Sequence, residues 1–144
     1  MDQPNDQVAS PSEPAPFQGN PRSIAATLAI CLSGWLVPGL GHILIGRWIR
    51  GLILAACVLL MFGLGLAMHG KLYDLEFDEL LPLFAFIANI GIGIPYWIAA
   101  RLGYGLGNMS WPSYDYGTTY LWVCGLLNYL IILDVFDIAQ GRKP

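Results

Sequence analysis

Two clusters of polar side chains have residue types and spacings that suit chemistry with anions, ions or protons. His42 is followed by Arg47 and Arg50, which are three residues apart and therefore share one helix face. A histidine beside two arginines can bind a lipid phosphate, or the three can be ordinary membrane-interface residues that reach toward headgroups. Asp134 and Asp137 are also three residues apart, so both carboxylates lie on one face of the last apolar stretch.

The two aspartates are poorly placed for local stability, because a carboxylate near a helix C-terminus opposes the helix dipole. Asp137 is near enough to the end of the stretch to be hydrated or to meet Arg142 or Lys143. Asp134 lies about one turn deeper and needs a partner or a polar cavity. Two interpretations stay open: a structural contact at a helix interface, or a role in handling ions, lipid headgroups or protons.

Two asparagines are the other polar groups singled out inside apolar sequence. Asn89 belongs to a stripe with Ala85 and Gly93 at intervals of four residues. Asn128 lies near the middle of the last stretch, close to Gly125. Small and polar residues hold helices together in lipid, where the hydrophobic effect gives no driving force between them. We expect both amides to face the interior and to hydrogen-bond across helices, with a substrate site as the alternative.

Other chemistry finds little support. The sequence has no nucleophile–base pair, metal-ligand cluster or cofactor motif, so we predict no catalytic, cofactor-binding or metal-binding residue and expect a protein that is not an enzyme. The three cysteines fall in different apolar stretches without CxxC spacing and are interpreted as small buried side chains: Cys31, Cys57 and Cys124. A net charge of −3 does not fit the basic footprint of a nucleic-acid-binding protein.

The elements that position these residues follow from the distribution of charge along the chain. Of 17 charged residues (7 Lys and Arg plus 10 Asp and Glu), only the two aspartates lie inside four long apolar stretches, at 24–45, 52–68, 80–100 and 118–139. A charge at the centre of a bilayer costs at least ~2.5–3.5 kcal/mol, which explains such segregation. The sequence therefore predicts an all-α membrane protein, a four-helix transmembrane bundle.

The predicted organisation is a tail followed by one domain. Residues 1–20, which are acidic and Pro-rich, are predicted to be disordered. Residues 21–141 are predicted to form the transmembrane domain, with spans at about 21–37, 42–68, 79–100 and 118–140. Pro38 and Gly39 predict a break between the first two helices, and Pro95 predicts a bend near 91–93.

Four spans would place both termini and the loop at 69–79 on one side of the membrane. That side would hold four basic residues, Arg22, Lys71, Arg142 and Lys143, against three on the other, Arg47, Arg50 and Arg101. Four against three is too small a difference for the positive-inside rule to decide. We favour cytoplasmic termini in a multi-pass protein of the cell membrane, and the alternative, in which the basic turn decides, inverts the whole protein. Four spans would also separate Asp134 and Asp137 from the turn at His42 by the thickness of the membrane.

The stretch at 35–51, with Pro-Gly-Leu-Gly at 38–41 and the Gly46-Arg47 pair, resembles the helical hairpin of the two-transmembrane-helix domain proteins. The segments at 116–128 and 133–143 resemble the end of an uncharacterised bacterial family of small four-span membrane proteins that share this hairpin. The resemblance implies a small protein of the bacterial inner membrane and no specific activity. The turn lacks the Asp-Arg-Phe triplet usual in the two-helix family, so no receptor-linked or signalling role carries over.

Three functions remain open. The leading hypothesis is a non-enzymatic scaffold or partner-binding protein, with the lipid bilayer, another membrane protein or a second copy of the chain as partner. The second is a subunit of a small oligomeric transporter or channel, since four short spans are typical of subunits that build a pathway between protomers. The third is a lipid-headgroup-acting enzyme that uses His42, Arg47 and Arg50 with an aspartate. The predicted separation of these groups disfavours it unless one of the apolar stretches is re-entrant.

Overall fold

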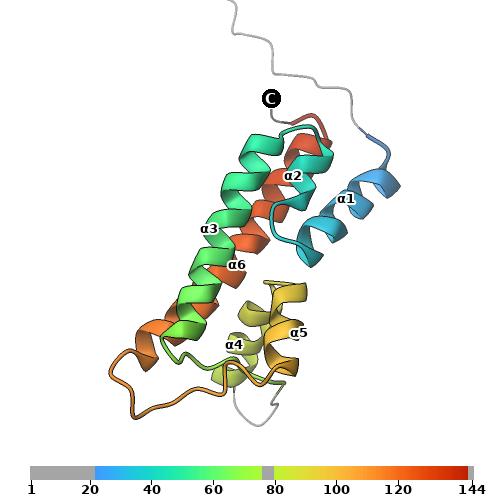
Figure 1. Cartoon of the computed structure of the whole chain (residues 1–144). Coiled ribbons are helices and arrows are strands. Elements are labelled where there is room, and N and C mark those ends of the chain that lie inside the picture. Colours follow the sequence, from blue (N-terminus) through green and yellow to red (C-terminus); the bar gives the residue numbers. More distant parts are fainter. Residues whose placement is uncertain (1–21, 76–79, 143–144) are drawn as a thin grey trace, which may run out of the picture.

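The computed structural model of this chain describes residues 22–75 and 80–142, and the predicted disordered tail at 1–20 lies outside them. The described residues form helices joined by turns and loops, which confirms the all-helical prediction; their one β-feature is an isolated bridge between Lys71 and Leu106. The helices, labelled in Figure 1, are α1 (Ile24–Leu36), α2 (Leu40–Leu44), α3 (Trp48–Ala67), α4 (Leu80–Ile90), α5 (Ile94–Arg101) and α6 (Tyr114–Ala139).

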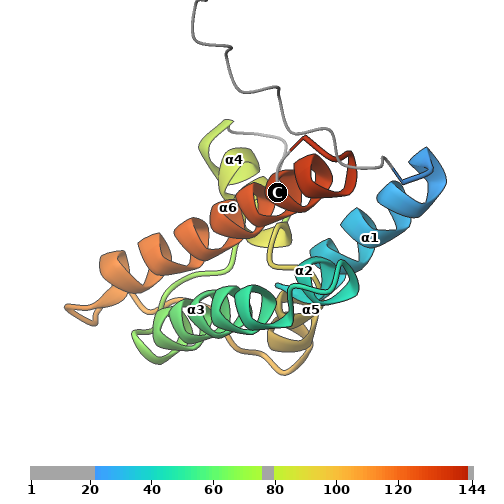
Figure 2. The ribbon, with the colours of Figure 1, turned by 90° about the horizontal axis from the view of Figure 1, so that it is seen from above.

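Two long helices, α3 and α6, form the frame of the molecule. They have 20 and 26 residues, and 20 residues at 1.5 Å each reach about 30 Å, the thickness of a bilayer's hydrocarbon core. They run side by side in opposite directions (Figures 1 and 2), with Gly65 near the end of α3 against Gly117 near the start of α6. A Cβ on Gly65 would lie 3.0 Å from the Gly117 carbonyl oxygen, so the small residues permit this close approach.

The helix of the first apolar stretch starts later than predicted. It begins at Ile24 and not at residue 21, because the Ser23 hydroxyl caps it by accepting from the Ala26 amide at 3.3 Å. The Arg22 amide donates to the Ala139 carbonyl at 3.2 Å, which places this start beside the C-terminal end of α6. With 13 residues, α1 is only about 20 Å long.

At the predicted Pro-Gly break the chain turns back. Pro38 disfavours helix in the preceding residue, and Gly39 at φ +81° begins α2 in a new direction. A side chain at position 39 would overlap the Gly51 carbonyl of α3, so the turn also depends on a small residue there. Gly41 then packs against Val135, close to the C-terminal end of α6. The first apolar stretch is therefore a hairpin of two short helices.

The third apolar stretch is a hairpin as well. The predicted bend at 91–93 is confirmed, but its angle of 112° reverses the chain and does not merely kink one helix. Gly93 at φ +78° precedes α5, and Pro95 occupies the first turn, where its missing N–H costs nothing. After α5 the chain runs beside the end of α3, since the Leu72 amide donates to the Gly105 carbonyl at 2.7 Å.

The prediction of four transmembrane spans is not confirmed. Two helices, α3 and α6, are long and apolar enough to cross a membrane, and α4 with α5 makes a third only if the bent pair counts as one span. The predicted span at 42–68 is divided by the turn at 45–47 between α2 and α3. Hydropathy detected each apolar stretch but could not show that two of them return to the end from which they came.

The tips of the two hairpins meet in the middle of the molecule. The Trp35 indole nitrogen, in α1, donates to the Ile90 carbonyl at the end of α4 at 3.1 Å. Gly93 lies against the last residues of α1, where a Cβ would overlap the Trp35 carbonyl oxygen. Figure 1 shows α1 and α2 beside the upper half of the long pair and α4 and α5 beside the lower half.

Candidate functional site

The structure brings His42 and Asp134 together. The imidazole Nε2 lies 3.1 Å from a carboxylate oxygen of Asp134, with the histidine fully buried and 39% of the aspartate side chain exposed. The sequence-based expectation that a membrane's thickness separates the aspartates from this turn is wrong. The reason is the hairpin, which returns α2 to the end where α6 finishes.

Local structure fixes the histidine in this position. Gly41 packs so closely on α6 that a Cβ there would lie 3.0 Å from the Val135 side chain. The neighbouring His42 is thereby held against the same helix, and its carbonyl accepts a hydrogen bond from the Arg47 amide at 2.9 Å. The packing of α2 on α6 thus determines where α3 begins and where Arg47 lies.

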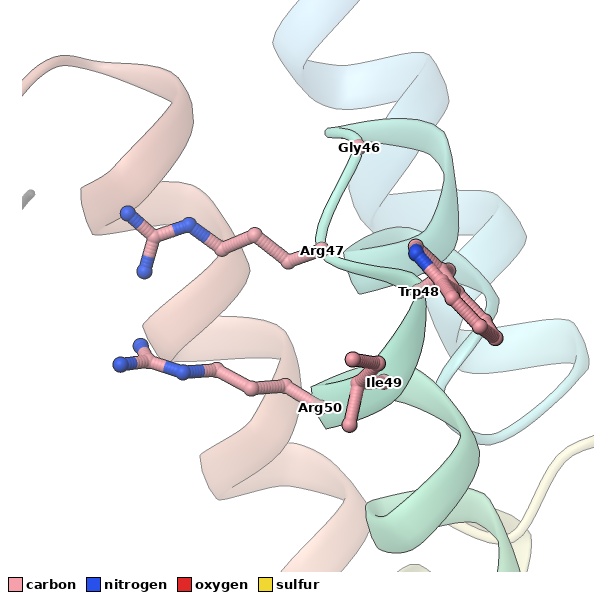
Figure 3. Close-up of a pocket in the computed structure, with 5 residues that line it drawn as sticks. All are labelled: Gly46, Arg47, Trp48, Ile49 and Arg50. Atoms are coloured by element: carbon pink, nitrogen blue, oxygen red, sulfur yellow. The ribbon is translucent and has the colours of Figure 1, made fainter.

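The two arginines at this turn share one direction. Figure 3 shows the side chains of Arg47 and Arg50 extending in the same direction, to the side on which α6 is drawn, whereas Trp48 points to the other side. With Gly46 and Ile49 they line an open hollow of about 540 Å³. Among the described residues, neither arginine forms a salt bridge with a carboxylate.

An apolar groove between α3 and α6 ends at the same place. Its volume is about 290 Å³, and it is lined by Leu54, Cys57, Val58, Leu127, Leu130, Ile131 and Asp134. Arg50 lies one turn before Leu54 on the same face of α3. The two arginines therefore lie at the end of the groove where Asp134 is found. The arrangement combines an apolar groove, which suits an acyl chain, with two positively charged side chains at one end.

The remaining aspartate and the cysteines give mixed outcomes. Asp137 lies 3.8 Å from Arg142, which is one of the alternatives that the sequence left open, and both side chains are exposed to solvent in part or in large measure. Exposed pairs of this kind contribute little, about 0–1 kcal/mol. The prediction of three buried cysteines holds for Cys124, but Cys31 is half-buried and Cys57 is exposed on the groove. In the described part of the chain, no three His, Cys, Asp or Glu side chains are grouped to hold a metal ion.

The two asparagines lie apart from this site, in the interior. Asn128 is fully buried, and its amide nitrogen donates to the Gly91 carbonyl at 2.8 Å, as the sequence predicted for a bond across helices. Asn89 is fully buried too, but neither atom of its amide has a hydrogen-bond partner among the described residues. The prediction of a cross-helix hydrogen bond is thus right for Asn128 and wrong for Asn89.

Sequence reasoning missed the residues at the hairpin tips. Trp35 and Gly93 join the two hairpins. Trp35 had not been singled out, and Gly93 had been noted only in the stripe with Ala85 and Asn89 and in the predicted bend. The available signal was the repeated pattern of a glycine and a proline within two residues of each other, at Pro38-Gly39 and again at Gly93 and Pro95. Each pair starts the second helix of a hairpin.

The fold and the site together define an all-helical protein whose long apolar helices are compatible with a membrane protein, with the His42–Asp134 contact and two arginines at one end of the long helices. The chain belongs to a family of unknown function, DUF6677, whose profile matches residues 29–144. This agrees with the resemblance to an uncharacterised family. Comparison with curated proteins and with solved structures found no match.

Proposed function

We propose that this is an integral membrane protein that binds an anionic phospholipid and catalyses no reaction. The phosphate lies between Arg47 and Arg50, and one acyl chain lies in the groove between α3 and α6. The single observation that supports this most strongly is the shared direction of the two arginines at the end of that groove (Figure 3). Under this proposal the protein is a partner-binding protein, and its partner is a lipid.

The chemistry of the site suits such a ligand. A guanidinium group donates two parallel hydrogen bonds to phosphate oxygens, and basic pockets at helix ends bind anionic headgroups. Each arginine near an anionic surface contributes about 1 kcal/mol. Trp48 is exposed on the other side of the turn, as suits the headgroup boundary, where tryptophan is enriched.

A structural role for the His42–Asp134 pair supports binding over catalysis. A general base needs a ring nitrogen within reach of the substrate. Here Nε2 faces Asp134, while Nδ1 is buried and has no partner in the described residues. We assign the pair to holding α2, and through it Arg47, in place. A lipid-headgroup-acting enzyme would instead require the imidazole to open toward the groove.

The experiment compares lipid binding by matched arginine variants. The full-length protein is placed in nanodiscs of phosphatidylcholine with increasing phosphatidylglycerol, and retained lipid is measured by native mass spectrometry. We expect Arg47→Gln/Arg50→Gln to weaken retention of phosphatidylglycerol by roughly 30-fold, from about 1 kcal/mol for each charge. Arg101→Gln, at the opposite end of the molecule, is the control and keeps wild-type retention. Equal retention by all three proteins would refute the proposal.

A further inference from the structure

The chain contains the same order of elements twice. In each half, a short helix is followed by a positive-φ glycine, a second short helix, another positive-φ glycine and finally a long helix. The first half consists of α1, Gly39, α2, Gly46 and α3, and the second of α4, Gly93, α5, Gly103 and α6. The two halves run in opposite directions, because α3 and α6 are antiparallel (Figure 1). This is the pattern of an inverted-topology repeat, in which binding sites lie where the broken helices meet.

Backbone carbonyls converge at the place where the two hairpin tips meet. The amide nitrogen of Asn128, near the middle of α6, lies 2.8 Å from the carbonyl oxygen of Gly91. It also lies 3.4 and 3.5 Å from the carbonyl oxygens of Gly34 and Trp35. Three acceptors from both hairpins therefore share one amide group with two protons.

The junction holds buried amide atoms that have no hydrogen-bond partner among the described residues. The Asn128 carbonyl oxygen belongs to the same amide group, is buried, and lacks a partner among the described residues. Asn89, in the last turn of α4, is 0% exposed, and both the oxygen and the nitrogen of its amide lack a partner among the described residues. Both α1 and α4 end here, and a helix C-terminus carries a partial negative charge. Unpaired buried polar atoms cost about 1–3 kcal/mol each, so a ligand that satisfies them is favoured.

We propose that the junction of the two hairpins binds a monovalent alkali-metal cation through amide and backbone carbonyl oxygens. Oxygen ligands without a carboxylate suit a singly charged ion, as in carbonyl-lined ion sites. The described Lys and Arg side chains belong to the turns and helix ends, so no ammonium or guanidinium neutralises the junction. An anion is disfavoured by the same carbonyl oxygens. Such a site, halfway along two antiparallel helices, is what a subunit of a small transporter or channel requires.

The test measures thermal stability in different salts. The full-length protein in phosphatidylcholine nanodiscs is melted at constant ionic strength while choline is replaced by Na⁺ or K⁺. A cation that binds only the folded protein raises Tm with the logarithm of its concentration, and we expect a rise of roughly 4 °C at about ten times the dissociation constant. Identical melting in choline, Na⁺ and K⁺ would overturn the proposal and leave the junction as a site for water only.

The decisive variant is Asn89→Leu. Because the Asn89 amide bonds to no described residue, its removal leaves the protein in choline as stable as wild type or more stable. We expect the variant to lose the Na⁺- or K⁺-dependent rise. The exposed loop residue Asn108 supplies the control, since Asn108→Leu keeps the rise. Retention of the full rise by Asn89→Leu would show that the cation binds elsewhere and would also overturn the proposal.

Discussion

At the residue scale, the contact between His42 and Asp134 explains how a carboxylate is retained inside an apolar sequence. The sequence indicated that Asp134 needs a partner, and the structure supplies one that is 92 positions earlier in the chain. His42 depends on this contact more than Asp134 does. His42 is fully buried and its Nδ1 already lacks a partner among the described residues, so Nε2 relies on this carboxylate.

Replacing the carboxylate should therefore destabilise the protein through the histidine. In Asp134→Leu the imidazole of His42 stays buried and its Nε2 loses the carboxylate, which lowers the free energy of unfolding by about 1–3 kcal/mol. For a chain of this size we expect a fall in Tm of roughly 5 °C, measured by differential scanning fluorimetry in nanodiscs. Asp137→Leu, one turn later on the same helix, removes the exposed ion pair with Arg142 and should shift Tm by less, about 1–2 °C.

A double variant separates the pair from other effects of the substitution. His42→Leu/Asp134→Leu replaces both partners by apolar side chains, which is often neutral for stability. Its Tm should recover most of the loss caused by Asp134→Leu alone. If the two single losses simply add in the double variant, the contact between the side chains contributes nothing.

At the element scale, the two hairpins depend on where a glycine allows the backbone to turn. Gly93 combines φ +78° with a close approach between the hairpins, since a Cβ there would overlap the Trp35 carbonyl oxygen. Gly46 has a positive φ of +93° but no atom within 4 Å of a Cβ. Gly63 lies inside α3 and is equally free of contacts. Substitutions at these three positions can therefore distinguish the cost of backbone strain from the cost of a steric clash.

Alanine at these positions should therefore give three different results. Gly46→Ala costs only the left-handed conformation, about 1–2 kcal/mol. Gly93→Ala adds the clash between hairpins and should lower Tm by clearly more than Gly46→Ala. Gly63→Ala should raise stability by about 0.5–1 kcal/mol, because alanine favours helix. Melting curves in nanodiscs check the order, and a Tm for Gly93→Ala equal to that of Gly46→Ala would mean that the tips do not touch.

At the scale of the whole molecule, the hairpins redistribute the basic residues. One end of the molecule, where α1 begins and α6 ends, holds four arginines: Arg22, Arg47, Arg50 and Arg142. The other end holds Lys71 and Arg101. Alternating spans would have divided the seven basic residues four to three. The described six divide four to two, and the positive-inside rule then favours the arginine-rich end, with both described chain ends, in the cytoplasm.

Cysteine labelling from each side of the membrane tests this arrangement. In a variant whose native cysteines are replaced by alanine, single cysteines are introduced as Gly46→Cys, Arg142→Cys and Ser110→Cys. We expect positions 46 and 142 to react with a membrane-impermeant maleimide from the cytoplasmic side and position 110 from the other side. Four alternating spans would instead place position 46 with position 110.

The sequence alone determined where this chain is apolar, the breaks at Pro38-Gly39 and near Pro95, and which side chains are costly to bury, but not the turn at 45–47. Charge segregation, Pro38-Gly39 and Pro95 act through local physics, so these predictions needed no partner. Only the tertiary structure decided the direction taken after each break, and with it the meeting of His42 with Asp134 and of the two hairpin tips. That direction depends on contacts between residues far apart in the sequence, such as Gly41 with Val135, which hydropathy, as a property of one segment at a time, does not contain.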